Sequence, residues 1–185
     1  MITTPSILLR SRDVGEADRI YTFYTRDHGK IEARATGVRK IKSKLAGHCV
    51  PNATIRCTFF PGRREMRLVQ ATALTHYPHI VRDFFSYGVA AYAREAVDVM
   101  TKSGVSDAVI FDLLVRLFDG LIQQKTASHL LLQAFLFHFL TALGYRPRSR
   151  NVIRDRVVPT LLRDHITEPL ESEQFLAFMQ AKGGA

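Results

Sequence analysis

Residues Lys30–Thr36 read KIEARAT, and residues Thr54–Phe60 read TIRCTFF. In both stretches an apolar side chain stands at every second position, and these positions are Ile31, Ala33, Ala35, Ile55, Cys57 and Phe59. Alternation with a period of two is the pattern of a β-strand that buries one face. The two stretches therefore predict strands of an antiparallel sheet, with the apolar positions facing inward.

Three further stretches of the first half read as strands, namely Pro5–Ser11, Arg19–Thr25 and Glu65–Leu74. Turn-forming residues separate the strands, since Asp13–Gly15 and Asp27–Gly29 follow the first two and Pro61–Gly62 precedes the last. The connection between the third and fourth strands is longer than the others. Five strands in about 75 residues with one long connection fit a small five-stranded barrel of the OB type.

The second half of the chain changes to a helical period. Asp83–Lys102 and Asp107–Gln123 carry apolar residues at spacings of three and four, and Asp107 is a candidate helix cap. Ser128–Leu143 is apolar nearly all round, which indicates a central helix, and Pro159–His165 and Glu171–Gln180 are short helical candidates. The predicted fold is α+β, with an OB-type domain over residues 1–80 and a helical domain over residues 81–185.

Charge is divided unequally between these two halves. Residues 1–80 hold 14 Lys and Arg against 6 Asp and Glu, whereas residues 81–185 hold 12 against 11. A solubility charge would be spread over the surface, so this imbalance indicates a basic module that faces a polyanion. The density is highest in Val38–Lys44, which reads VRKIKSK.

The candidate nucleic-acid contacts are the cations of the third strand, of the long connection, of the predicted loop between the fourth and fifth strands and of the start of the fifth strand. They are Lys30, Arg34, Arg39, Lys40, Lys42, Lys44, Arg63, Arg64 and Arg67. The alternative is a solvated basic loop, the usual fate of a charge run. Candidate rings for base stacking are Tyr21, Phe23, Tyr24 and Phe60, although about half of such rings in alternating strands must face a core.

Other residue patterns favour neither an enzyme nor a metalloprotein. No phosphate-binding glycine loop or nucleophile elbow is present, and we expect no cofactor. Cys49 and Cys57 are too few for a four-thiolate zinc site. His138 reads as a core histidine, and the acidic residues Asp13, Glu16 and Asp18 read as turn residues that pair with nearby arginines.

Neither a membrane span nor an export signal is recognisable in the sequence. The richest apolar run, Leu130–Leu143, is too short to cross a bilayer, and the first residues lack the pattern of a signal peptide. The default expectation is a protein of the reduced cytoplasm.

The string ILLRSRDVGEADRIYTFYTRDHGKIEARATGVRKIKSK over Ile7–Lys44, followed by LAGH and Pro51, resembles the bacterial RecO recombination-mediator family. Phe135–Tyr145 is similar to the family's helix that ends in Leu-Gly-Tyr, and Arg163–Phe178 to its final helix. In that final helix acidic Glu171 and Glu173 stand at two usually basic positions. No cysteine follows Cys57, so the sequence reads as a shortened member without the zinc module of many relatives.

The resemblance implies binding of single- and double-stranded DNA near the nucleoid, annealing of complementary strands, and work with RecR, RecA and the tail of single-strand-binding protein. That tail is acidic and apolar, so the candidate partner contacts are the helical-half cations Arg94, Arg116, Arg146 and Arg148. The alternative is that Arg94 and Arg116 pair with Asp98 and Asp112 one helical turn away. A second functional hypothesis is a stand-alone adaptor for single-stranded nucleic acid, DNA or RNA, without mediator activity.

Overall fold

The computed structural model describes residues 1–123 and 127–147 of the chain. The chain forms two compact units. The first unit contains Met1–Tyr77 and the later segment Thr101–Phe111, and the second contains Pro78–Met100 and the described residues from Asp112 to Pro147. The first unit thus includes a segment that lies outside residues 1–80.

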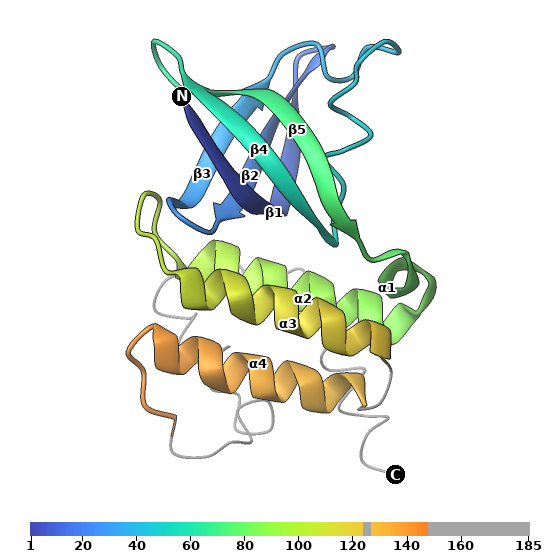
Figure 1. Ribbon diagram of the computed structural model, residues 1–185, viewed down its shortest axis with the longest axis vertical. Coiled ribbons are helices and arrows are strands. Elements are labelled where there is room, and N and C mark those ends of the chain that lie inside the picture. Colours follow the sequence, from blue (N-terminus) through green and yellow to red (C-terminus); the bar gives the residue numbers. More distant parts are fainter. Residues whose placement is uncertain (124–126, 148–185) are drawn as a thin grey trace. The chain divides into compact units, whose positions relative to one another are not determined.

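The first unit is a closed five-stranded barrel, as predicted (Figure 1). Its strands are β1 (Ile2–Val14), β2 (Asp18–Thr25), β3 (Gly29–Ala35), β4 (Ala53–Pro61) and β5 (Met66–His76). The strand order around the barrel is β1-β2-β3-β5-β4, in which β3 and β5 are parallel and all other neighbours are antiparallel. This architecture confirms the OB-type α+β prediction.

The barrel core consists of the alternating positions that the sequence pattern assigned to the inward face. Ala35, Ile55, Cys57 and Phe59 are fully buried there, with Ile31 and Ala33 almost as enclosed. Phe23 packs edge-on against Phe59, with ring centroids 5.7 Å apart. Burial of these apolar side chains supplies the main favourable energy of such a fold.

The two ends of the barrel differ in construction. At one end, here called the loop end, lie the β1–β2 turn, the start of the β3–β4 connection and the β4–β5 loop (Figure 1). At the other end, the closed end, the segment Thr101–Phe111 packs beside the β2–β3 turn. There the Gly104 amide donates to the Lys30 carbonyl over 3.2 Å, and the Tyr24 hydroxyl donates to the Asp107 carbonyl over 3.3 Å. A late part of the chain therefore completes the barrel unit.

The helices of the described chain are α1 (Pro78–Arg82), α2 (Phe84–Met100), α3 (Ala108–Gln123) and α4 (Ser128–Ala142). Asp83 accepts a hydrogen bond from the Ser86 amide over 2.8 Å, and Asp107 accepts one from the Val109 amide over 2.8 Å. These caps explain why α2 and α3 begin where the sequence pattern predicted. Gly144 takes a positive φ of 87° just after α4, as its predicted terminator.

Helix α4 buries one face rather than most of its surface. Leu132, Phe135, Leu136, Phe139 and Leu140 are buried, whereas His138 is exposed. The prediction of a core histidine at position 138 was therefore wrong, because that position falls on the outer side of the helical period. The candidates Pro159–His165 and Glu171–Gln180 lie outside the described residues.

None of the helices in the described ranges 1–123 and 127–147 has the length and hydropathy needed to span a lipid bilayer.

Candidate nucleic-acid interface

The β3–β4 connection is fastened to the β1–β2 turn at the loop end. The Arg39 amide donates to the Ala17 carbonyl over 3.0 Å, and the Arg39 guanidinium donates to the Gly15 carbonyl over 3.2 Å. The same guanidinium lies 3.5 Å from the Asp13 carboxylate. Arg39 was predicted as a phosphate contact, but its side chain already serves as an anchor for the loop.

Asp18 supplies a second anchor between the β1–β2 turn and the β3–β4 connection. Its carboxylate accepts the Gly37 amide over 2.8 Å and the Arg34 guanidinium over 3.3 Å. These donors hold the pKa of Asp18 below its usual value, with the Gly37 amide as the largest cause. Arg34 also forms an ion pair with Glu65 of the β4–β5 loop. All three connections at the loop end are therefore linked to one another.

Two carboxylates of this network belong to the acidic turn that the sequence analysis singled out. Asp13 accepts from the Arg19 side chain over 2.6 Å, which lowers the pKa of Asp13. Arg19 in turn lies over the Tyr21 ring, with 5.9 Å between the guanidinium carbon and the ring centroid. The prediction that Asp13 pairs with a neighbouring arginine is confirmed.

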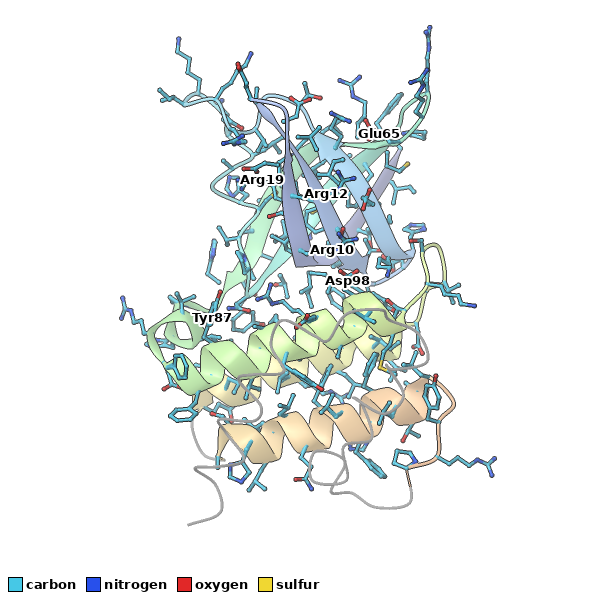
Figure 2. All side chains as sticks on the ribbon, turned by 180° about the vertical axis from the view of Figure 1, so that it is seen from behind. Arg10, Arg12, Arg19, Glu65, Tyr87 and Asp98 are labelled. Atoms are coloured by element: carbon cyan, nitrogen blue, oxygen red, sulfur yellow. The ribbon has the colours of Figure 1, made fainter. Side chains whose placement is uncertain are left out.

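Five predicted contact residues remain exposed without an ion pair in the part of the chain that the structure describes. This group, here called the unpaired cations, comprises Lys42, Lys44, Arg63, Arg64 and Arg67. Nitrogen-tipped side chains extend from both loops away from the barrel (Figure 2). Lys40 differs slightly, since its charge contributes to the lowered pKa of Asp18.

The outward face of β1, β2 and β3 carries further cations beside the predicted Arg34, and the sequence analysis missed two of them, Arg10 and Arg12. Strand register places Arg10, Thr22 and Glu32 in one row across the three strands. It places Arg12, Ile20 and Arg34 in the next row toward the loop end. Figure 2 shows Arg10 and Arg12 on this side of the barrel. The available signal was the spacing of Arg10 and Arg12, which puts both on one face of a strand.

These strand arginines are already paired with carboxylates. Glu32 lies 3.7 Å from Arg10 and 3.4 Å from Arg12. Exposed pairs of this kind contribute little to stability and can exchange one anion for another. We call Arg10, Arg12, Arg19 and Arg34 the paired arginines.

Lys30, also predicted as a contact, lies at the closed end of β3 and is not brought together with the loop cations.

Three of the four aromatic residues proposed for base stacking are buried. Tyr21 and Phe23 lie in the barrel core, and Tyr24 is covered where its hydroxyl meets the segment Thr101–Phe111. Burial raises the pKa of Tyr24 to about 12. The stacking role predicted for Tyr21, Phe23 and Tyr24 is therefore wrong. Phe60, next to the β4–β5 loop, is 52% exposed.

The two cysteines are free thiols buried in the barrel core. Removal from water raises the pKa of Cys49 and of Cys57 to about 12, so both sulfurs stay protonated near neutral pH. Within the described residues, no three His, Cys, Asp or Glu side chains gather in a way that could hold a metal ion.

The cations proposed for partner binding in the helical half fall into three classes. Arg94 is only 7% exposed, and burial lowers its pKa, so its predicted position on an exposed side of α2 is wrong. Arg116 on α3 and Arg146 after α4 are exposed, as expected. Arg148 lies outside the described residues. Asp98 and Asp112 each interact with other groups in the structure.

Comparison with known proteins covers both units of this chain. Residues 1–77 match the family described as "Recombination protein O N terminal", and residues 81–154 match "Recombination protein O C terminal".

Three relatives illustrate the similarity, and each bears the name "DNA repair protein RecO". The protein of Pelotomaculum thermopropionicum is 33% identical over 145 residues, which cover 77% of this chain and 55% of the relative. The protein of Roseiflexus sp. strain RS-1 is 33% identical over 145 residues, covering 78% and 50%. That of Streptomyces griseus is 35% identical over 149 residues, covering 76% and 60%. The match thus spans between half and three fifths of the length of these three relatives.

Proposed function

This chain belongs to the RecO family, and we propose that it acts in DNA repair and recombination by binding DNA at the loop end of its barrel. The observation that carries the proposal is a set of unpaired cations on two loops and the adjoining start of β5, at one end of a closed barrel, namely Lys42, Lys44, Arg63, Arg64 and Arg67. Barrels of the OB type bind nucleic acid on the face of strands 2 and 3 and between the adjoining loops.

Counterion release supplies the affinity in this proposal. Each phosphate that a lysine or arginine neutralises frees condensed counterions, so affinity falls steeply as salt rises. The unpaired cations give up no existing ion pair when they meet a phosphate, whereas the paired arginines must first leave a carboxylate. The loops therefore bind first, and Arg10, Arg12 and Arg34 extend the contact along the outward strand face.

The finer activities of the proposal come from the family and not from the site geometry. They are binding of single-stranded and duplex DNA, annealing of complementary strands, and assistance to RecA together with RecR. The acidic tail of single-strand-binding protein is the proposed ligand of the helical half. Arg116 and Arg146 are its candidate contacts there, because both are exposed cations. The proposal contains no catalytic step for this chain.

A salt titration tests the proposed DNA contact. We expect the chain to bind single-stranded and duplex DNA with a steep decrease of affinity as salt increases. Replacement of Lys42, Lys44, Arg63 and Arg64 by alanine should flatten the plot of log affinity against log salt by about three units. Because these side chains are exposed, the melting temperature should stay close to that of the wild type.

Arg56→Ala is the control, since it removes one exposed cation from the middle of β4, away from both loops. Its salt slope should change by less than about one unit. An unchanged slope in the quadruple variant would exclude the loop end as the binding surface. Annealing of complementary strands should accompany binding, and a preference for RNA without annealing would favour the stand-alone adaptor.

A further inference from the structure

Ile41 stands at the tip of the basic β3–β4 connection with its side chain fully exposed. It is the most exposed large hydrophobic residue in the described part of the chain. Its neighbours Lys40 and Lys42 are also exposed. Single exposed aliphatic residues are common on protein surfaces, so exposure alone assigns no role. The construction of the loop around Ile41 supplies the additional argument.

Ile41 lies at the tip of a short turn whose flanking residues are anchored to the barrel. The Ser43 amide donates to the Lys40 carbonyl over 2.9 Å, which makes Ile41 and Lys42 the two central residues of the turn. On either side of the turn, Val38 is buried in the barrel core and Leu45 packs against the core. The apolar residues before and after Ile41 thus face inward, while Ile41 alone of the three points to solvent.

The anchors described above fix this tip relative to the barrel. The Arg39 amide and guanidinium bind carbonyls of the β1–β2 turn, and the Lys40 amide donates to the Gly37 carbonyl over 3.1 Å. An apolar side chain on a tip that is held in this way can enter a ligand without first being ordered. The cost of ordering a flexible loop is therefore smaller on binding.

We propose that Ile41 contacts nucleobases, inserting between neighbouring bases while Lys40, Lys42 and Lys44 hold the flanking phosphates. This inference rests on the proposed function and adds a base contact to it. Apolar wedges such as isoleucine part neighbouring bases in several classes of DNA-binding protein. Three of the four candidate stacking rings are unavailable for this task, because Tyr21, Phe23 and Tyr24 are buried, which leaves Phe60 as the one exposed ring among the four.

The positions of Lys40 and Lys42 on either side of Ile41 indicate which kind of ligand the tip can bind. Cations on both sides of an apolar residue match a polymer whose phosphates alternate in space with flat apolar groups. A lipid surface offers the same charges, and vesicles of anionic lipid therefore belong in the test. A base step opened by Ile41 would expose the pairing edges of adjacent bases, which is useful to a protein that brings complementary strands together.

The experiment compares two single strands of equal length on the full chain. One strand carries normal bases with a central 2-aminopurine, and the other is abasic throughout. The variant Ile41→Ser should bind the base-containing strand about fivefold more weakly than the wild type, because it loses the apolar contact. Both proteins should bind the abasic strand equally and with the same salt slope. The wild type should also raise 2-aminopurine fluorescence, and Ile41→Ser should lose most of this rise.

Leu74→Ser is the matched control, because Leu74 is an exposed aliphatic residue of β5 at the closed end. It should behave as the wild type on both strands. Equal weakening of Ile41→Ser on both strands, or an unchanged fluorescence rise, overturns the inference. Binding to anionic vesicles that requires Ile41, without a base-dependent difference, overturns it too. Failure of the wild type to bind either strand would instead reject the proposed function.

Discussion

The loop end and the closed end of the barrel are made by the same five strands but hold their polar groups in different ways. At the closed end, backbone carbonyls of Lys30 and Asp107 accept hydrogen bonds across the contact with Thr101–Phe111. At the loop end, Lys42, Lys44, Arg63 and Arg64 have no ion pair in the described ranges 1–123 and 127–147. Satisfied groups stabilise the fold, and charges without a partner remain available to a ligand.

This contrast predicts that substitutions at the two ends have separate effects. Changes at the closed end should lower the free energy of unfolding, and changes at the loop end should alter DNA affinity at nearly constant stability. Each prediction below tests one side of this separation.

The largest effect is expected at Gly29, where the segment Thr101–Phe111 approaches the barrel most closely. Gly29 has a positive φ of 66°, and a Cβ at this position would overlap the Val105 carbonyl. Gly29→Ala should therefore lower the free energy of unfolding by more than about 2 kcal/mol. Urea denaturation of the full chain measures this loss.

Gly15→Ala provides the comparison at the loop end. Gly15 also has a positive φ, 59°, but nothing lies within 4 Å of the position that a Cβ would take there. This change should cost only about 1 kcal/mol, the penalty of the left-handed backbone conformation. Equal losses in the two variants would show that Val105 does not constrain Gly29.

The sequence predicted the barrel well because alternation is a local signal. The strand predicted at Thr54–Phe60 differs from β4 by one residue at each end, and its predicted inward residues Ile55, Cys57 and Phe59 are fully buried. The basic loop was equally visible as a charge run. By contrast, Thr101–Phe111 contacts Tyr24, Gly29 and Lys30, which precede it in the sequence by more than 60 residues. No local sequence pattern indicates a contact over such a separation.

The errors at the candidate site have the same origin. Tyr24 faces outward from the barrel, as a stacking residue must, yet the segment Thr101–Phe111 covers it. Arg94 sits on a helix whose sequence period suggested an exposed side, but α2 is buried on most of its circumference. The pairing of Arg10 and Arg12 with Glu32 depends on strand register, which the separate strand patterns leave open.

A smaller effect is expected from Asp18, which anchors the basic connection through the Gly37 amide. Because its folded pKa lies below the unfolded value of about 3.9, its contribution is full above that pH and is lost as the pH falls through the folded pKa. The protection of the Gly37 amide in the wild type, which is the ratio of its intrinsic exchange rate to the observed rate at the same pH, should fall in the acid range. Asp18→Asn should show reduced protection of this amide already at neutral pH and little further loss in acid.

This anchor also tests the separation of the two ends. Asp18→Asn should weaken DNA binding, because the loop that carries Lys42 and Lys44 is held less firmly, while the hydrogen bond from Tyr24 to Asp107 at the closed end is untouched. Unchanged exchange at Gly37 would mean that the Arg39 contacts alone hold the connection.

The smallest effect concerns Glu32, the one acidic residue in the rows of the outward strand face that hold Arg10, Arg12 and Arg34. Glu32→Gln removes a charge that repels phosphate and releases Arg10 and Arg12 from their ion pair. Affinity for single-stranded DNA should rise about twofold, and the salt dependence should steepen by about one unit.

Asp27→Asn makes the same charge change in the β2–β3 turn at the closed end, where Asp27 accepts a hydrogen bond from the Thr4 hydroxyl over 2.6 Å. It should leave both quantities unchanged, since net charge alone does not set the affinity. An equal gain in both variants would mean that the barrel attracts DNA through its total charge, whereas weaker binding by Glu32→Gln would show that Glu32 positions the arginines for phosphate.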